Sequence, residues 1–345
     1  MSALQVAFLS QAESCEALDS PFMGRLLHLL ATHWPQDTAL AAKCATFEGD
    51  ICPKGHSLPL RIAGGLHALV LQGKDADLTA VYPPNQSDDA DLQTAVLSAL
   101  RTHDTFLTDW ITHAPQTNEV RRSAVLIATA HLLADRFTLP IKLSELGASA
   151  GLNLMFDQFH LDVGDGYGPQ STVALSPDWT GPLPPQANVT ISNRRGVDLN
   201  PLNSANAEDS LRLQSYLWAD QEERLHRTQA AIALNSSELD QDDAISWLER
   251  RLSAPNMGEL HMVYSTVAWQ YFPEDRQSHG TSLMEAAGAQ ATEDAPLAWL
   301  SYEADDIPHG AALTLRLWPG NHTIPLGRAD FHGRWVEWQA PAKLP

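Results

Sequence analysis

The feature that most constrains the fold is the segment from Ile141 to Leu154, which reads IKLSELGASAGLNL. An apolar run typical of a β-strand ends at the acidic residue Glu145, and small residues then lead into a second apolar run typical of a helix. Gly147, Ser149 and Gly151 leave the backbone of the turn open to close approach. A helix after such a turn offers unpaired N–H groups and a positive dipole end. The segment therefore predicts a strand, a turn that binds a small molecule, and a helix.

Two known kinds of site resemble this segment. The residues Glu145, Gly147, Ser149 and Gly151 together resemble the first cofactor motif of S-adenosylmethionine-dependent methyltransferases. The pattern Gly-x-Ser-x-Gly taken alone also matches the nucleophile elbow of α/β-hydrolases, where the serine attacks a carbonyl group. The rest of the chain has to separate these two interpretations.

Length and composition indicate a globular protein. A chain of 345 residues is too long for one small core, and it predicts two domains or one α/β domain with a large extension. Hydrophobic residues make up 44% of the chain, but no apolar run approaches the length of a membrane span, so we expect no membrane partner. The apolar patch after Met1 follows no basic region, and we expect no signal peptide.

Cysteine usage indicates the cellular compartment, and the net charge limits the class of partner. Cys15, Cys44 and Cys52 are odd in number and lack a Cys-x-x-Cys spacing, which favours a reducing cytoplasm over a disulfide framework. The net charge of −20 repels polyanions, so we expect no nucleic-acid partner, and it is typical of solubility or of adaptation to a salty habitat. The 14 histidines show no His-x-x-x-His spacing, and no metal site is predicted.

The pattern of apolar and polar residues changes after Pro140. Before it the pattern is helical, with Ser20 and Pro21 marking a helix start and further helices expected over 58–71, 90–111 and 118–137. After it, short β-rich runs alternate with helical patterns over 220–234 and 243–252. Strands are expected over 141–146, 189–197, 260–266, 297–302, 313–318 and 334–338.

These patterns predict a helical region over residues 1–117 and an α/β domain over residues 118–345. The last two strands have only turns between them and are expected to form a closing antiparallel pair. Residues 162–188 are rich in Gly and Pro and are expected to be an insertion. One feature conflicts with this scheme: Lys142 and Ser144 alternate with apolar residues, although a central parallel strand should be apolar on both faces. Either this strand has a partly polar cover or its central position is wrong.

A second acidic residue follows the next predicted strand. Asp198 lies in the segment Arg195-Gly-Val-Asp-Leu-Asn-Pro201, where a carboxylate could accept hydrogen bonds from both hydroxyls of a ribose. Its alternative role is ordinary turn chemistry, because Asp-x-Asn-Pro favours a loop by itself. Asp243, before an amphipathic helix, resembles an acidic motif that contacts adenine, and its alternative role is a helix cap.

Other candidates lie where later strands are expected to end. In folds of this class the carboxyl ends of strands line the ligand crevice, so Trp269 and Gln270 are candidates for substrate binding, and Asn118 joins them from the helical cover. Tyr271, Glu303 and His332 are candidate catalytic residues, the last two as general bases. The alternatives are core aromatics for Trp269 and Tyr271 and ordinary surface groups for Glu303 and His332.

Five segments of the chain jointly resemble the bacterial family catalogued as domain of unknown function 2332. The resemblance runs nearly the full length and rests on residues 115–120, 143–154, 196–201, 267–271 and 332–335. It implies a domain similar to the class I methyltransferase fold, a Rossmann-like, mostly parallel sheet with an antiparallel closing strand. This implication extends to Glu145, Gly147, Gly151 and Asp198 as cofactor-binding residues. Ser149 stands where methyltransferases usually place a second glycine.

The sequence thus predicts a methyltransferase that uses S-adenosylmethionine on a small-molecule or protein acceptor. Gly147, Ser149 and Gly151 would approach the amino-acid part of the cofactor. Glu145 would receive its ammonium group, Asp198 its ribose, and Asp243 its adenine. One alternative is a serine hydrolase with Ser149 as nucleophile and Asp198 and His332 as its partners. Another is a non-catalytic protein that binds a nucleotide or a protein partner.

Overall fold

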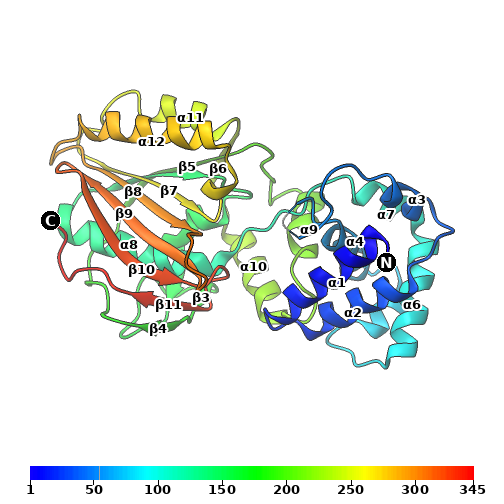
Figure 1. The fold of residues 1–345 in the computed structure, drawn as a ribbon. Helices are drawn as coiled ribbons and strands as arrows, with labels where there is room; N and C mark the ends of the chain where they lie inside the picture. Colours follow the sequence, from blue (N-terminus) through cyan, green and yellow to red (C-terminus); the bar gives the residue numbers. More distant parts are fainter. Residues whose placement is uncertain (54) are drawn as a thin grey trace. The chain divides into compact units, whose positions relative to one another are not determined.

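The structure, a computed structural model, describes residues 1–53 and 55–345 (Figure 1). These residues form two compact units. The first unit comprises Met1–Thr117 and Ser204–His226, and the second comprises Asn118–Asn203 and Arg227–Pro345. The chain therefore leaves the second unit after Asn203, completes the first, and returns within one helix, α10 (Glu222–Leu234).

The first unit is helical and closes around an apolar core. Its helices start with local capping: the Ser2 hydroxyl accepts a hydrogen bond from the Gln5 amide at the start of α1, and Pro21 begins α2. Leucines such as Leu26, Leu30 and Leu66 are fully buried in the core. Besides part of α10, the helices are α1 (Ala3–Glu16), α2 (Pro21–His33), α3 (Ala39–Ala45), α4 (Leu58–Leu71), α5 (Ala76–Val81), α6 (Asp89–Thr102), α7 (Asp104–Trp110) and α9 (Ala207–Ser215).

The predicted helix over 58–71 is confirmed, but the single helix predicted over 90–111 is wrong. His103 leaves the helical conformation, with φ −107° and ψ 25°, and separates α6 from α7. A tertiary contact favours this break, because the carboxylate of Asp104 accepts hydrogen bonds from the amides of Ala39 and Leu40, both at 2.7 Å. The apolar period of the segment gives no sign of that contact.

The second unit is built on a mixed sheet whose helices cover both faces (Figure 1). The strands run in the order β4-β11-β10-β9-β8-β7-β1-β5-β6. Their bounds are β1 (Ile141–Leu146), β4 (Asp178–Thr180), β5 (Ile191–Asp198), β6 (Glu238–Gln241), β7 (Leu260–Thr266), β8 (Leu297–Glu303), β9 (Ala311–Trp318), β10 (His322–Ala329) and β11 (Trp335–Trp338). The remaining elements are η1 (Val120–Arg122), α8 (Ser123–Phe137), η2 (Leu152–Gln158), β2 (His160–Leu161), β3 (Ala174–Leu175), α11 (Ala244–Arg251), η3 (Trp269–Tyr271) and α12 (Glu274–Gly288).

Strands β6, β5, β1, β7 and β8 are parallel, so the predicted α/β class with a mostly parallel sheet is confirmed. From β1 the chain adds β5 and then β6 on one side, and later β7 and β8 on the other, which places a topological switch point between β1 and β7. The pairs β8–β9, β9–β10 and β10–β11 are antiparallel, but the predicted direct pairing of 313–318 with 334–338 is wrong. An unpredicted strand, β10, lies between β9 and β11.

The helix expected after the turn at Gly151 is a 3₁₀-helix, η2. Tertiary hydrogen bonds fix this short segment: the Asn118 side chain accepts from the Leu152 amide at 2.8 Å, and the Ser123 hydroxyl donates to Asn153 Oδ1 at 2.8 Å. The chain then runs through residues 162–188, which contribute β3 and β4. Strand β4 joins the edge of the main sheet beside β11.

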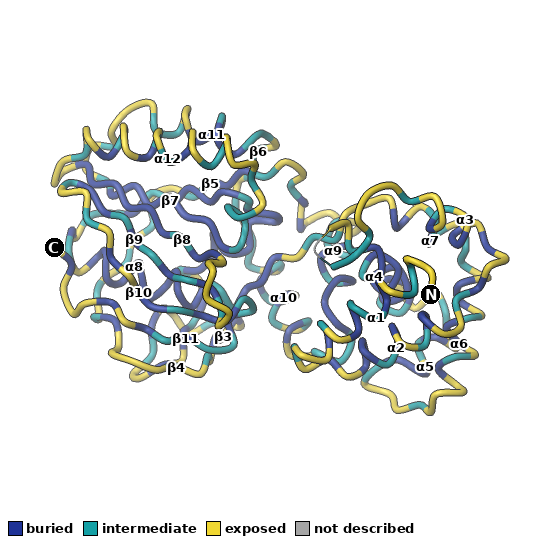
Figure 2. The backbone as a smooth tube through the Cα atoms, viewed as in Figure 1, coloured by how far each residue is buried: buried dark blue, intermediate teal, exposed yellow. Residues whose placement is uncertain are grey.

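The polar residues of β1 have a polar cover, which resolves the conflict noted in the sequence. Strand β1 is central and buried, and so is its neighbour β7, drawn dark blue in Figure 2. On the face that carries Ser144, its hydroxyl is 2.8 Å from His261 Nε2 and accepts from Arg251 Nε at 3.1 Å. Lys142 donates to Asn256 Oδ1 at 2.6 Å. A parallel strand can therefore hold polar side chains inside a sheet when partners satisfy them.

Two findings bear on membrane and metal association. Over residues 1–53 and 55–345, no helix has the length and apolar character that crossing a membrane requires. In the same part of the chain, no group of three or more His, Cys, Asp or Glu side chains is placed to hold a metal ion.

Candidate functional site

The candidate site lies at the carboxyl ends of β1 and β7, on either side of the switch point. The loops that follow these two strands touch, because a Cβ atom added to Gly147 would lie 2.6 Å from the Cβ of Ala268. Only glycine fits at this contact, where φ is +71°. In open α/β sheets a ligand crevice forms at such a point, outside the carboxyl ends of the strands.

Each of the two loops holds a non-glycine residue in left-handed backbone. Ser149 after β1 and Val267 after β7 both have φ of +54°. This conformation is uncommon for a side chain and is a true outlier for a β-branched residue such as valine. Conformations of this kind persist only where surrounding structure enforces them, and they concentrate at functional sites. The switch point therefore carries backbone strain on both sides.

The turn after β1 is fastened to β5 by hydrogen bonds. The amides of Gly147 and Ala148 both donate to the Val197 carbonyl, at 2.9 and 3.0 Å. The Ser149 amide donates to Asp198 Oδ2 at 2.8 Å, and Asp198 Oδ1 accepts from the Asn200 amide at 2.9 Å. Asp198 is thus hydrogen-bonded directly to the turn after β1, as expected if the two belong to one site. One of its hydrogen-bonding positions holds the turn and a second holds the Asn200 amide after β5, whereas a carboxylate has about four such positions.

The hydroxyl of Ser149 differs from its amide. Ser149 is 5% exposed, and its Oγ has no hydrogen-bond partner among the described residues. A buried hydroxyl without a partner costs roughly 1–3 kcal/mol. The turn therefore presents an unsatisfied polar atom in addition to its strained backbone.

Glu145 is buried beside this turn. It is 1% exposed, and it accepts a hydrogen bond from the hydroxyl of Tyr264, the residue opposite it on β7, at 3.4 Å. Burial raises the pKa of Glu145 well above its ordinary value of 4.5; the bond from Tyr264 and the charge of Arg122 lower it, and the charge of Asp198 raises it. The carboxyl group is therefore stabilised in its neutral form.

Arg122 and Tyr264 take part in this site and were not among the predicted residues. Arg122 Nη1 donates to the Thr266 carbonyl at the end of β7, and its Nε donates to the Phe331 carbonyl, both at 2.8 Å. It thereby ties the loop after β10 to the carboxyl end of β7. The adjacent arginines Arg121 and Arg122, ahead of an apolar helix in an acidic chain, were the available signal.

Glu303, at the end of β8, organises the loop after β7. Its carboxylate accepts from the amides of Ala268 and Trp269 at 3.1 Å and from the amide of Gln270 at 3.4 Å. Burial raises the pKa of Glu303, and these amides oppose the rise. Gln270 in turn accepts from the Ala304 amide at 2.9 Å. The structure therefore brings Glu303, Trp269 and Gln270 together.

The aromatic candidates of this loop differ in burial. Trp269 packs against Trp299, with ring centroids 5.1 Å apart, and against Phe272, at 5.5 Å. These contacts place it at the edge of the apolar cluster beneath α11 and α12. Tyr271, two residues later, is 73% exposed. Of the two, Tyr271 is the side chain that a ligand in solution can reach.

The other predicted residues have structural partners of their own. Asp243 caps α11 by accepting from the Ser246 amide at 2.8 Å, and it forms an ion pair with Arg276. Burial opposes the change, but the bonds from Ser246 and Arg276 lower the pKa of Asp243. Asn118 accepts from the Leu152 amide behind the turn. His332 donates its amide to Asp330 at 3.0 Å, in the loop that Arg122 anchors through Phe331.

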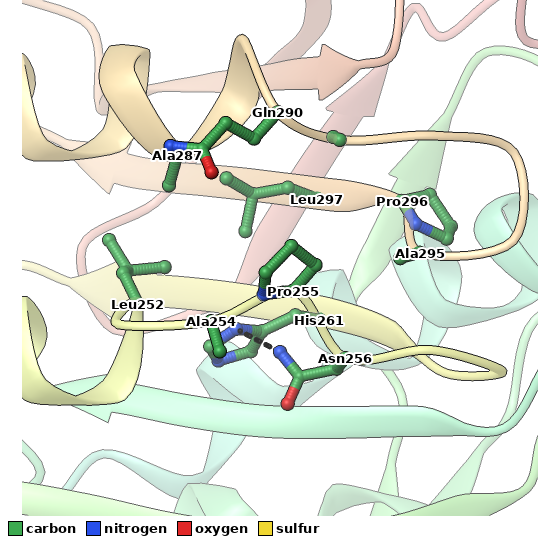
Figure 3. Close-up of a pocket in the computed structure, with 11 residues that line it drawn as sticks. Leu252, Ala254, Pro255, Asn256, His261, Ala287, Gln290, Ala295, Pro296 and Leu297 are labelled. Carbon is green, nitrogen blue, oxygen red and sulfur yellow. Dashed lines mark hydrogen bonds between the residues drawn. The ribbon is translucent and has the colours of Figure 1, made fainter.

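The amino end of the sheet holds a cavity of a different kind (Figure 3). His261 and Asn256 lie at its wall and are joined by a hydrogen bond of 3.3 Å. Its volume of about 30 Å³ holds one or two water molecules and is too small for an organic ligand. A larger cavity of about 330 Å³ lies between α8, η2 and residues 168–189, with His131, Phe156 and Asp157 in its wall.

Comparison with known proteins identifies the family of the chain. No curated protein sequence matches it. A family model matches residues 5–338, which is nearly the whole chain and includes every residue of the candidate site. The chain therefore belongs to the family described as "Uncharacterized protein conserved in bacteria (DUF2332)".

Proposed function

We propose that the switch point between β1 and β7 binds S-adenosylmethionine and that the protein is a methyltransferase acting on a small molecule or a protein. The observation that carries this proposal is the strained pair of loops: Ser149 and Val267 lie in left-handed backbone on opposite sides of the switch point. The surrounding hydrogen bonds hold both loops in place before any ligand arrives. Such preorganisation lowers the ordering cost of binding.

The roles follow from the atoms available at the switch point. The backbone between Gly147 and Gly151 would approach the amino-acid part of the cofactor. The hydrogen-bonding positions of Asp198 that are not used by the turn would accept from the ribose hydroxyls. S-adenosylmethionine supplies an activated methyl group, so the protein mainly has to align the acceptor. Glu145 accepts a hydrogen bond from Tyr264 inside the sheet. From that position it would contact the cofactor from beneath the turn.

Calorimetric titration with S-adenosylmethionine and S-adenosylhomocysteine tests the proposal. Asp198→Asn is the sharpest variant, because an amide oxygen can still hold the Ser149 amide while the charged acceptor is lost. A hydrogen bond to a charged group contributes about 1.5–3 kcal/mol, so affinity should fall by tenfold or more. Asp165→Asn, which removes one exposed charge from residues 162–188, is the matched control and should bind as the wild type does. No heat of binding with wild-type protein would refute the proposal.

The serine hydrolase is the second candidate, and the buried, unpartnered Ser149 hydroxyl in left-handed backbone favours testing it. A hydrolase needs this hydroxyl as nucleophile, whereas a methyltransferase needs only a small residue there. A fluorophosphonate probe labels activated serines. Labelling at Ser149 that disappears in Ser149→Gly would replace the methyltransferase with the hydrolase. Cofactor binding without methyl transfer to any acceptor would instead favour a non-catalytic binding protein.

A further inference from the structure

A set of hydrogen-bond donors lies buried in the first unit. The set, here called the donor cluster, consists of Arg61 on α4, Trp110 on α7, and Arg212 and Tyr216 at the carboxyl end of α9. Helix α4 packs against both α7 and α9. The residues come from three separate parts of the chain, and the fold brings them together.

The members of the donor cluster are in mutual contact. The rings of Trp110 and Tyr216 are tilted, with centroids 6.2 Å apart, and the guanidinium carbon of Arg212 lies 4.9 Å from the Trp110 ring centroid. The Tyr216 ring rests on the backbone of α4, because a Cβ atom added to Gly64 would lie 2.6 Å from it. Both Arg61 and Arg212 act electrostatically on the Tyr216 hydroxyl.

Three donors of the cluster are buried with no acceptor at hydrogen-bond distance, although Trp110 also interacts with the Tyr216 hydroxyl over a longer range. Trp110 Nε1, Arg212 Nη1 and Tyr216 Oη have no hydrogen-bond partner among the described residues. Their side chains belong to residues that are only 3%, 9% and 7% exposed. Buried polar atoms in proteins are nearly always paired, so three orphaned donors in one cluster call for a specific explanation.

The donor cluster holds two positive charges, those of Arg61 and Arg212, and contains no acidic residue to balance them. Arg61 is 5% exposed and donates to two backbone carbonyls, those of His56 at 2.8 Å and Ile111 at 3.0 Å. Arg212 pairs through Nη2 with Glu208, whose side chain is 71% exposed. Of the two buried guanidinium groups, that of Arg212 pairs with an exposed carboxylate, and that of Arg61 has no carboxylate partner among the described residues. This excess of positive charge is unusual in a chain of net charge −20.

We propose that the donor cluster binds an oxyanion, a carboxylate or phosphate group of a small molecule. Such a group supplies only acceptors and negative charge, which are the two things the cluster lacks. Guanidinium, indole N–H and phenol groups are all donors to oxyanions, and guanidinium prefers planar or tetrahedral oxyanions with paired oxygens. The bound group would connect α9 to α4 and α7, and so would hold the returning segment Ser204–His226 within the first unit.

The inference does not rest on the proposed methyltransferase activity. Its test is the binding of inorganic phosphate and of acetate to the full-length protein, followed by the intrinsic fluorescence of its 10 tryptophans, Trp110 among them, and by the thermal unfolding midpoint. Both readouts should respond to the oxyanion and saturate. The arm that saturates at lower concentration identifies phosphate or carboxylate as the group recognised.

Two variants and a control connect the response to the cluster. Tyr216→Phe removes one hydroxyl and preserves the ring on α4, and it should weaken binding about tenfold, as the loss of one bond to a charged group predicts. Arg212→Met removes the charge and should weaken binding further. Arg101→Met removes an arginine whose side chain is 49% exposed and pairs with Asp37, and it should bind as the wild type does.

Two outcomes would overturn the inference. One is wild-type protein that gives no saturable response to either anion. The other is an equal response of wild type, Tyr216→Phe and Arg212→Met, because general stabilisation by phosphate acts on the whole surface and does not depend on the cluster. Tyr216→Phe keeps the test decisive even where Arg212→Met fails to fold.

Discussion

The two ends of the parallel sheet are built in different ways. At the carboxyl end, carboxyl groups bond mainly to backbone amides: Asp198 holds the turn after β1, and Glu303 holds the loop after β7. At the amino end, side chains bond to one another around His261. Ser149 and Val267 are left-handed in the loops after β1 and β7. Near the amino end Thr138 is left-handed where α8 ends ahead of β1, but the residues bonded around His261 are not.

The difference shows how one sheet separates stability from function. The network around His261 satisfies its members, which is what a stabilising polar core requires. The carboxyl end retains strain and an unpaired hydroxyl at Ser149. Burial also shifts pKa values in opposite directions at the two ends. It lowers the pKa of His261 well below 6.5 and raises that of Glu145 well above 4.5. In both groups burial favours the neutral form.

The largest effect is expected at the amino end, from His261→Ala. The change leaves a cavity and removes the partner of Ser144 and Asn256, so the free energy of unfolding should fall by roughly 3–5 kcal/mol. Denaturant unfolding measures this loss. His279→Ala, at an exposed position, is the control and should change the free energy by less than about 0.5 kcal/mol. A loss below about 1 kcal/mol for His261→Ala would contradict a stabilising network.

Gly147→Ala tests the steric contact at the carboxyl end. The new Cβ meets the Cβ of Ala268 at 2.6 Å and lies in left-handed backbone, so the variant should lose roughly 2–3 kcal/mol of unfolding free energy. Gly73→Ala is the matched control, because Gly73 has φ +61° and no atom within 4 Å of the added Cβ. It should lose only about 1 kcal/mol. Equal losses in the two variants would show that the two loops do not touch.

The pH dependence of stability tests the opposite titrations. The pKa of Glu145 is raised in the folded state. Its contribution to the free energy of unfolding is therefore fully present below about pH 4.5 and is lost as the pH rises through the folded-state pKa. Glu145→Gln should therefore gain stability relative to wild type as pH rises above 4.5, whereas Glu249→Gln, at an exposed position, should not.

His261 should show the reverse dependence. Its pKa is lowered in the folded state, so its contribution is present above about 6.5 and is lost as pH falls below that value. The stability difference between wild type and His261→Ala should accordingly shrink on acidification. Denaturant unfolding at several pH values measures both curves, and two curves of the same slope would contradict the comparison.

The smallest effect is expected from Ser149→Gly. Glycine adopts φ +54° without strain, and the variant has no buried hydroxyl to satisfy. These gains exceed the entropy that glycine loses on folding, so the free energy of unfolding should rise by about 1 kcal/mol. Thermal unfolding measures the change, and the affinity for S-adenosylmethionine should be retained or improved. A clear loss of stability would mean that the hydroxyl has a partner in solution.

Periodicity and turn chemistry predicted the elements that carry the sheet. The strands at 141–146 and 260–266 are confirmed, and each is a short β-rich run bounded by turn residues. Strand β6, with the sequence ELDQ, is too polar to recognise, and β10 contains Pro325 and Gly327, which normally argue against a strand. Pro325 and Gly327 lie at an irregularity of the β9–β10 ladder, which is where a sheet tolerates them.

The candidate site was predictable only where a motif marked it. Asp198 and the turn after β1 were found because each belongs to a local pattern, and the structure joins them. Arg122 and Tyr264 carry no such pattern, because their importance arises from strands and loops that meet only in the fold. Whether Asp243 contacts adenine stays a prediction, since its carboxylate is engaged by Ser246 and Arg276.

The division of the first unit between Met1–Thr117 and Ser204–His226 has a consequence for synthesis on the ribosome. Domains usually fold in order as the chain emerges from its amino end. Here α9 emerges only after β1 and β5 have been made, so the first unit cannot finish folding before two strands of the second are outside the ribosome. Arg212 and Tyr216 arrive with that late segment. Until then Arg61 and Trp110 stay without their neighbours, so the helical unit can complete its donor cluster only after synthesis of the second unit has begun.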